Sequence, residues 1–242
     1  MNLIIDVGNT RVKFAVFSEN NLIWKHNFSL NDFKKEFKTT RKQFPELKQA
    51  IVSSVGRLQE QEISSVKKHL KLLQLNASTK IPFQNNYETP TTLGVDRIAL
   101  VSASILGFSN SDVLIIDAGT CITYDFITSK NIYLGGAISP GIRLRYMALN
   151  NLTANLPLLE TEVPTEIIGT STKASIHSGV IFGTVNEIDG VIEKYREKYS
   201  DLTVILTGGD AKMLSKQLKS SIFANSDFLL EGLNYILEFN SL

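Results

Sequence analysis

Short apolar runs separated by polar or glycine-containing turns fill the first part of the chain. Residues 2–6, 11–17 and 21–28 are rich in β-branched and aromatic side chains, and a polar turn separates the last two runs. Such spacing predicts three consecutive strands that form a meander. Residues 49–55 form a further apolar run, which predicts a strand buried on both faces.

Helical spacing of apolar residues alternates with these runs, and a second meander follows in the later half. Residues 82–92 are polar and contain two prolines, so we expect a loop there. Helices are predicted at residues 31–44, 58–74, 95–106, 141–151, 172–198 and 211–219. Further strands are predicted at residues 112–117, 121–127, 132–138 and 202–207. This alternation indicates an α/β protein.

One local pattern occurs twice, about half a chain apart. Residues 4–10 (IIDVGNT) are matched by residues 115–120 (IIDAGT), and in each case another predicted strand follows at once. We infer a duplicated α/β fold, with one domain in residues 1–110, the other in residues 111–242, and a cleft between them. A chance repeat is the alternative, because Asp-x-Gly turns are common in hairpins.

Composition narrows the class of protein. The chain has 25 Lys and Arg against 24 Asp and Glu, so we expect neither nucleic acid nor an anionic membrane as a partner. The single cysteine, Cys121, excludes a disulfide framework and favours a small, buried hydrophobic role. No apolar run approaches the roughly 18 residues of a membrane span, and no signal peptide is evident. We expect a soluble, cytoplasmic protein.

The two glycine turns carry groups suited to phosphate. Glycine allows a ligand to approach the backbone closely, and consecutive N–H groups in such turns can bind anions. Because carboxylates repel phosphate, Asp6 and Asp117 each need a cation between themselves and the phosphate. Two such turns would suit a nucleoside triphosphate with Mg²⁺. Lys13, on the following strand, could reach phosphate oxygens or could equally be an exposed strand lysine.

A third cluster precedes the predicted helix 95–106. Gly94 makes the turn, and Asp96 and Arg97 lie near the helix N-terminus. Phosphoryl transfer to an alcohol needs a carboxylate that orients the hydroxyl and accepts its proton, and an arginine can pair bidentately with an anionic substrate. The alternative is an ordinary helix start with a surface ion pair. Two further glycine-rich segments, residues 135–141 and 206–210, mark tight turns or close backbone approach.

Together these segments resemble the type III pantothenate kinases, a branch of the acetate kinase, sugar kinase, Hsp70 and actin superfamily. P-loop and protein-kinase motifs are absent from the sequence. The matching segments cover nearly the whole chain: Asp6-x-Gly-Asn-Thr10 with Lys13, Leu93-Gly94-x-Asp-Arg97, Asp117-Ala-Gly-Thr120, Gly135-Gly-x-Ile-x-Pro-Gly141, Thr153-Ala-Asn-Leu-Pro157 and Thr207-Gly-Gly209. The resemblance implies two ribonuclease-H-like domains with mixed sheets, a duplicated actin-like ATPase fold, and a homodimer.

The resemblance also implies an activity, the ATP-dependent phosphorylation of pantothenate at its primary hydroxyl by direct in-line transfer, the first step toward coenzyme A. It assigns Asp96 as the proton acceptor, Asp117 to a monovalent cation (K⁺ or NH₄⁺), and Asp6 to a position near Mg²⁺. The residues implied for ATP binding are Asp6, Val7, Gly8, Asn9, Thr10, Arg11, Val12, Lys13 and Thr120. Those implied for pantothenate binding are Tyr87, Gly94, Val95, Asp96, Arg97 and, across the subunit interface, Thr172.

Two other functions remain open from the sequence. A related kinase for another small alcohol, or a phosphatase, would share the two Asp-Gly-Thr turns without needing residues 94–97. A non-catalytic regulatory protein is the second alternative, and the presence of Asp6, Asp96 and Asp117 argues against it. Tyr87 also has a structural alternative, as a loop aromatic that packs on the core.

Overall fold

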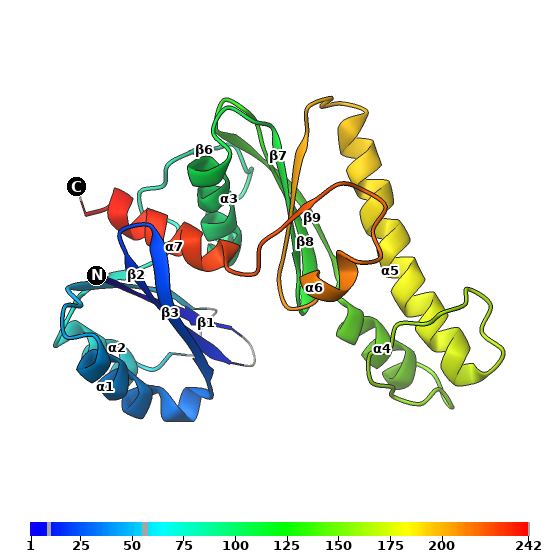
Figure 1. Ribbon diagram of the computed structural model, residues 1–242, viewed down its shortest axis with the longest axis horizontal. Helices are drawn as coiled ribbons and strands as arrows, with labels where there is room; N and C mark the ends of the chain where they lie inside the picture. The colour runs from blue at the N-terminus through cyan, green and yellow to red at the C-terminus, as the bar shows by residue number, and fades with distance from the viewer. Residues whose placement is uncertain (9–10, 55–57, 242) are drawn as a thin grey trace. The chain divides into compact units, whose positions relative to one another are not determined.

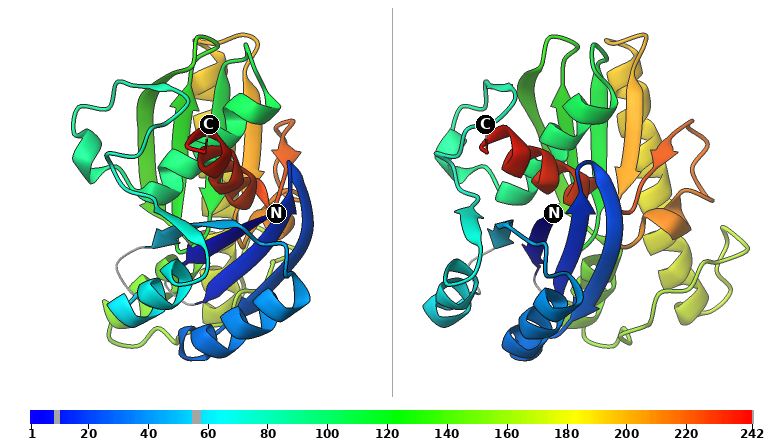
Figure 2. Two further views of the ribbon diagram at one scale, coloured as in Figure 1. Left: turned by 90° about the vertical axis from the view of Figure 1, so that its left-hand side faces the viewer. Right: turned by 60° about the vertical axis from the view of Figure 1, so that its left-hand side comes forward.

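The computed structural model describes residues 1–8, 11–54 and 58–241, and it divides into two compact units (Figures 1 and 2). The first unit consists of Met1–Ser109 together with Asp227–Leu242, and the second consists of Asn110–Ser226. None of the described helices is both long and apolar enough to cross a membrane.

The first unit contains a mixed sheet in the order β3-β2-β1-β4-β5. The first three strands form antiparallel pairs, which confirms the predicted meander. β4 runs parallel to β1 on one side and to β5 on the other, and its central residues are buried, as the apolar run predicts. The strands are β1 (Asn2–Val7), β2 (Val12–Ser18), β3 (Asn21–Phe28), β4 (Gln49–Ser54) and β5 (Lys71–Gln74).

Helices pack on both faces of this sheet. Phe33 and Phe37 of α1 and Val66 of α2 share a core with Leu3 and Ile5 of β1. On the other side, α7 contacts β1 and β4, and it lies beside α3 (red and green in Figures 1 and 2). The bounds are α1 (Phe33–Gln43), α2 (Glu60–Lys67), α3 (Val95–Gly107) and α7 (Phe228–Phe239), with 3₁₀ turns η1 (Leu30–Asp32) and η2 (Pro90–Thr92) and the short strand β6 (Gln84–Asn85).

The helix predicted over residues 58–74 is too long. It ends at Lys67, and Lys71 begins β5, which pairs with β4 from Gln49 onward. The apolar residues in this segment fit one face of a helix and also a strand, so periodicity alone could not separate the two. Pairing with β4 stabilises residues 71–74 as a strand.

The C-terminal helix α7 is absent from the sequence-based prediction. The predicted domain boundary would place it in the second domain, whereas it belongs to the first compact unit. The buried apolar face of α7 packs against α3, β1 and β4 of this unit. Buried Asn234 adds two hydrogen bonds, because its side chain accepts from the Asn2 amide at 2.7 Å and donates to the Glu19 carbonyl at 2.9 Å. These bonds join the end of the chain to its beginning.

The second unit repeats the topology of the first. Its strands lie in the order β9-β8-β7-β10-β11, with an antiparallel β7-β8-β9 meander followed by two parallel partners. The same order of pairing in both units supports duplication over a chance repeat of the turn. The strands are β7 (Val113–Ala118), β8 (Cys121–Ile127), β9 (Ile132–Pro140), β10 (Thr203–Thr207) and β11 (Phe223–Ala224).

A long helix covers one face of the second sheet. Ile181, Ile188 and Ile192 of α5 pack with Leu114 and Ile116 of β7. The helix predicted over residues 211–219 is shorter than expected, since α6 ends at Leu214 and the chain continues through turns into β11. The helices are α4 (Ile142–Asn151), α5 (Thr172–Arg196) and α6 (Ala211–Leu214).

Candidate active site

Asp6 lies near the end of β1 and faces Lys13 of β2. The two residues are register partners, and the Lys13 ammonium is 3.7 Å from Asp6 Oδ2. The Asp6 residue is 8% exposed, and this burial raises the pKa of its carboxyl group. The positive charge of Lys13 opposes the rise, and the negative charge of Asp96 adds to it. Two carboxylates and one ammonium therefore share this part of the first unit.

Asp96 is held in the first turn of α3. Its Oδ1 accepts a hydrogen bond from the Arg97 backbone N–H at 2.9 Å. Arg97 is only 5% exposed, so the pair is not the surface ion pair that the sequence left as an alternative. The fold thus brings the predicted proton acceptor into electrostatic contact with Asp6, which comes from a distant part of the sequence.

Tyr87 and Arg97 form the adjacent part of the site. The Arg97 guanidinium carbon lies 5.6 Å from the centroid of the Tyr87 ring, a cation–π arrangement. The Tyr87 backbone N–H donates to the Asn85 side chain at 3.0 Å, which fixes the loop before η2. Tyr87 therefore packs on a charged group that the resemblance also assigns to the substrate.

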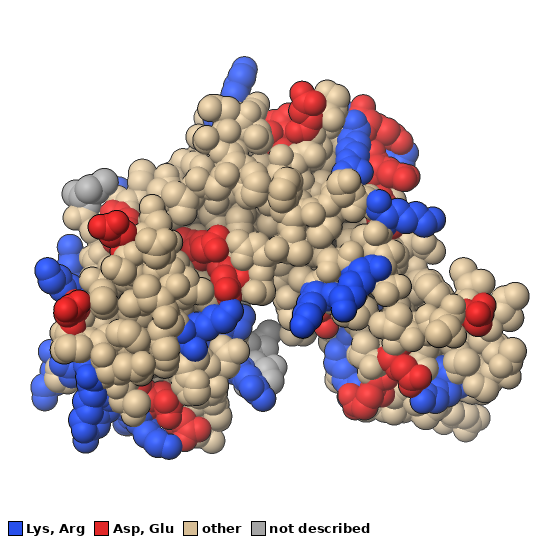
Figure 3. Space-filling view, viewed as in Figure 1, with Lys and Arg blue, Asp and Glu red and all other residues tan. Residues whose placement is uncertain are grey.

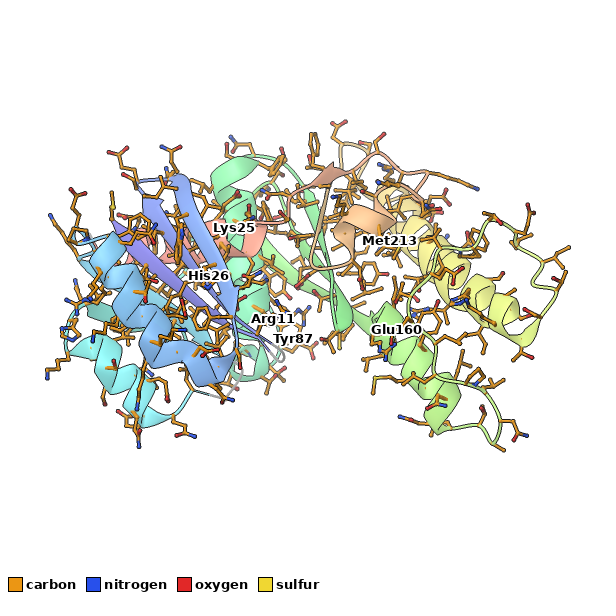
Figure 4. All side chains as sticks on the ribbon, turned by 60° about the horizontal axis from the view of Figure 1, so that its bottom comes forward. Arg11, Lys25, His26, Tyr87, Glu160 and Met213 are labelled. Atoms are coloured by element: carbon orange, nitrogen blue, oxygen red, sulfur yellow. The ribbon has the colours of Figure 1, made fainter. Side chains whose placement is uncertain are left out.

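The predicted ATP loop follows β1. Val7 and Val12 are buried register partners, so their side chains belong to the core and leave only backbone groups for a ligand. The Gly8 N–H donates to the Arg11 carbonyl at 3.1 Å. The side chain of Arg11, which is labelled in Figure 4, is exposed. The predicted contacts Asn9 and Thr10 lie outside the described residues.

In the second unit, Asp117 lies one residue before the end of β7. Its register partners are Thr123 on β8 and Thr207 on β10, so the three side chains share one face of the sheet. The Thr123 hydroxyl is buried and has no hydrogen-bond partner within the described part of the chain. Sequence reasoning missed Thr123, although strand alternation from the Asp117 turn could have indicated it.

The end of β7 and the turn after it, residues 117–120, are packed from two sides by the two glycine-rich segments. On one side, the Gly141 N–H donates to the Thr120 carbonyl at 3.0 Å. On the other, Gly208 adopts a φ of 95° and lies against the Ala118 carbonyl and the Asp117 carboxylate, where a side chain would overlap both. The weak motifs at residues 135–141 and 206–210 thus support the predicted nucleotide turn.

Cys121 corrects one expectation. Its side chain was expected to be buried as a small hydrophobic residue, but the cysteine is exposed. Cys121 is the first residue of β8 and directly follows the turn, where strand alternation directs its side chain away from the core that Ile122 enters.

Thr172 begins α5 and lies on a broad groove between α4 and α5. The preceding Ser171 caps the helix, because its hydroxyl accepts the Ala174 N–H at 3.2 Å. The groove has a volume of about 1250 Å³ and is mostly apolar, with walls that include Leu149, Leu152, Leu156, Ile176 and Val180. Thr172 is therefore exposed on a mostly apolar surface of the second unit.

Charged side chains of both signs are interspersed on the face drawn in Figure 3. Among residues 1–8, 11–54 and 58–241, no group of three His, Cys, Asp or Glu side chains is arranged to hold a metal ion. A cation at Asp6 or Asp117 would therefore need other oxygen ligands, such as hydroxyls, carbonyls or substrate phosphates.

Comparisons with known proteins identify relatives over the length of the chain. The sequence model of the family described as type III pantothenate kinase matches residues 2–194. A type III pantothenate kinase from Christiangramia forsetii is 52% identical over 240 residues, which cover 99% of each chain.

Two solved structures show the fold. A Campylobacter jejuni protein described as a Baf family transcriptional activator has a TM-score of 0.67 at 22% identity, covering 99% of this chain and 98% of that one. A glucokinase from an Antarctic psychrotroph has a TM-score of 0.53 at 12% identity and covers 98% of both chains. The predicted α/β fold class with two mixed sheets is confirmed.

Proposed function

The chain belongs to the type III pantothenate kinase family, and on that premise we propose that it transfers the γ-phosphoryl group of ATP to the primary hydroxyl of pantothenate. One observation carries this proposal: the first unit holds two fixed carboxylates, Asp6 at 3.7 Å from the Lys13 ammonium and Asp96 bonded by the Arg97 N–H at 2.9 Å, and the Asp96 charge adds to the raised pKa of Asp6. Phosphoryl transfer to an alcohol needs one carboxylate toward the metal-bound phosphates and another toward the hydroxyl, and this pair can supply both.

Asp96 orients the pantothenate hydroxyl and accepts its proton. The Arg97 N–H bond to Asp96 Oδ1 fixes this carboxylate at the start of α3, and we assign its other oxygen to the substrate hydroxyl. Because the transition state of phosphoryl transfer is largely dissociative, correct placement of this oxygen contributes more to catalysis than its basicity does. The Arg97 guanidinium, held against Tyr87, binds the pantothenate carboxylate, and residues 94–95 contribute backbone groups beside it.

Asp6 is suited to a position near Mg²⁺. When bound with ATP, Mg²⁺ neutralises negative charge that develops on the phosphates. A single buried carboxylate fits an ion that usually keeps water and phosphate oxygens as its other ligands. Lys13 balances part of the Asp6 charge and can also reach a phosphate oxygen from β2.

Asp117 and Thr123 are suited to a monovalent cation. A K⁺ or NH₄⁺ ion needs several oxygen ligands, and the buried Thr123 hydroxyl supplies one on the same sheet face as Asp117. Thr120, exposed in the next turn, contacts the nucleotide. The cation then reduces the repulsion between the Asp117 carboxylate and the phosphates, as any carboxylate this close to phosphate requires.

A homodimer is proposed for the groove between α4 and α5. Leu152 is 83% exposed, and Ile167 and Ile168 in the following loop are 67% and 77% exposed. Burial of these side chains against a second copy would remove apolar surface from water and would bring Thr172 to the partner's substrate. Leu152→Glu is expected to produce monomers in sedimentation velocity experiments.

A coupled ATP assay with pantothenate tests the proposed function. We expect ADP formation that depends on pantothenate and Mg²⁺ and increases with K⁺. Asp96→Asn should lower kcat by roughly 10² to 10⁴, the range for loss of a general base. Asp32→Asn, an exposed carboxylate at the start of α1, is the matched control and should retain activity.

Other outcomes distinguish the alternative functions. Activity with another small alcohol but not with pantothenate would indicate a different kinase. Phosphate release from ATP without an acceptor, or from a phosphate ester, would indicate a phosphatase. Wild-type turnover in Asp96→Asn would exclude Asp96 as the proton acceptor.

A further inference from the structure

Arg145 of α4 ties together two other elements of the second unit. Its Nε donates to the Pro140 carbonyl at 2.9 Å, and its Nη2 donates to the Ser139 hydroxyl at 2.9 Å. The same Nη2 bonds Oε2 of Glu187 on α5. The Arg145 side chain is 21% exposed, so one largely buried guanidinium links the end of β9 to α5.

Glu187 extends this network to β8. Its Oε1 accepts a hydrogen bond from the Tyr124 hydroxyl at 3.0 Å, and Tyr124 is 1% exposed. Burial opposes ionisation of Glu187, but hydrogen bonds from Arg145, Ser139 and Tyr124 hold its pKa below the usual range. Burial and the adjacent Glu187 charge raise the pKa of Tyr124, so Tyr124 stays neutral and Glu187 stays ionised near neutral pH.

The end of β9 lies directly against the candidate nucleotide turn. Pro140 is the register partner of Cys121, and the Gly141 N–H donates to the Thr120 carbonyl at 3.0 Å. A Cβ atom at Gly141 would overlap the carbonyl oxygens of Gly119 and Thr120. With so little space between the two backbones, a shift of residues 139–141 must move the turn.

We infer that Arg145 and Glu187 are positioning residues that hold residues 119–120 in the geometry that receives the phosphates of ATP. Neither side chain is required to touch the nucleotide, since both act through residues 139–141. This inference rests on the proposed function of the turn. A lysine cannot replace Arg145, because one ammonium does not reproduce the fixed fork of donors that reaches Pro140, Ser139 and Glu187 together.

Binding of Mg²⁺ with a non-hydrolysable ATP analogue, measured by calorimetry, is the direct test. Arg145→Lys and Glu187→Gln should each weaken binding by about 10-fold or more and raise KM for ATP in parallel. Arg145 also lines the groove proposed for the dimer, so sedimentation velocity must first show that Arg145→Lys has the same oligomeric state as the wild type. With that state unchanged, KM for pantothenate should stay within about twofold of the wild-type value. The double variant should bind the analogue at most about twofold more weakly than the weaker single variant, because each single change already breaks the same link.

Matched variants separate positioning from general destabilisation. Lys194 lies on α5, like Glu187, and forms an exposed ion pair with Glu197. Lys194→Gln removes this ion pair and should change neither analogue binding nor KM for ATP. Tyr124→Phe keeps the ring in the core and removes only the hydroxyl that bonds Glu187. This variant should weaken analogue binding by roughly 3-fold, in line with loss of one hydrogen bond, while its circular dichroism spectrum stays native.

The results also distinguish this inference from the proposed role of the turn. Thr120→Val tests the turn itself. If Thr120→Val weakens analogue binding while Arg145→Lys and Glu187→Gln bind normally, the positioning role is overturned and the nucleotide turn stands. If Thr120→Val, Arg145→Lys and Glu187→Gln all bind the analogue normally, the role of the turn and the positioning role both fall. A selective rise in KM for pantothenate in Arg145→Lys would also overturn the inference.

Discussion

The guanidinium of Arg97 lies against the ring of Tyr87, with its central carbon 5.6 Å from the ring centroid. Arg97 is almost completely buried, and its backbone N–H is bonded to the carboxylate of Asp96. A loop aromatic, a cation and a carboxylate are therefore fixed together at the start of α3. For an alcohol that also carries a carboxylate, this arrangement can bind one end and activate the other.

Removal of the Tyr87 ring is expected to weaken pantothenate binding through Arg97. A desolvated cation–π contact contributes about 0.5–2 kcal/mol, so Tyr87→Leu should raise KM for pantothenate by roughly 2- to 30-fold. Tyr87→Phe keeps the ring and should change KM by less than about 3-fold. Steady-state kinetics at saturating ATP measure both values. Equal losses in the two variants would show that the hydroxyl, rather than the ring, is the functional group.

Asp6→Asn should make the protein more stable at neutral pH while it abolishes activity. Burial raises the pKa of Asp6 in the folded state above its ordinary value of 3.8, so the ionised side chain destabilises the fold at neutral pH. The gain in melting temperature should shrink as the pH falls through the raised pKa and should vanish below 3.8. A lower melting temperature for Asp6→Asn at neutral pH would mean that the contact with Lys13 outweighs burial.

Lys13→Met should shift the acidic limb of the pH profile for kcat/KM of ATP toward higher pH. The Lys13 charge lowers the pKa of Asp6, and its removal leaves burial and the Asp96 charge, which both raise that pKa. Asp6 would then lose its negative charge at a higher pH than in the wild type. Lys25→Met is the matched control, because Lys25 on neighbouring β3 pairs with Asp227 and should not affect the profile. If Lys13→Met leaves the acidic limb unchanged, ionisation of Asp6 is not what causes that limb.

Local patterns were sufficient to predict the duplicated strands and their turns. An apolar strand that ends in Asp before a glycine turn is readable from sequence, and both meanders form with β1 and β7 at equivalent places in their sheets. The first turn of α3 was also readable, because Gly94 precedes Asp96 in a clear helix start. These features depend on neighbouring residues and on strand alternation.

Features that depend on distant partners were not predicted. β5 becomes a strand because β4 offers it a parallel edge. α7 returns to the first unit because its apolar face packs on α3, β1 and β4, with Asn234 bonded to Asn2. The link between Arg145 and Glu187 connects α4 to α5, and no residue spacing in the sequence predicts it. Thr123 falls between these cases, since alternation places it beside Asp117 but its burial depends on packing.

Thr123→Val provides the sharpest test of the cation site, because valine keeps the shape of threonine and removes its hydroxyl. Loss of one neutral oxygen ligand, at about 0.5–1.5 kcal/mol, should raise the K⁺ concentration for half-maximal activity by roughly 2- to 10-fold. The melting temperature should rise less with KCl than in the wild type when choline chloride keeps the ionic strength constant. Thr123→Ser should restore both responses, and Asp117→Asn should remove them.

Thr184→Val, which removes a buried hydroxyl bonded to the Val180 carbonyl in α5, controls for the loss of any buried hydroxyl. If Asp117→Asn removes the K⁺ response and Thr123→Val retains it, the cation site stands without Thr123; a normal K⁺ response in Asp117→Asn would place the cation elsewhere.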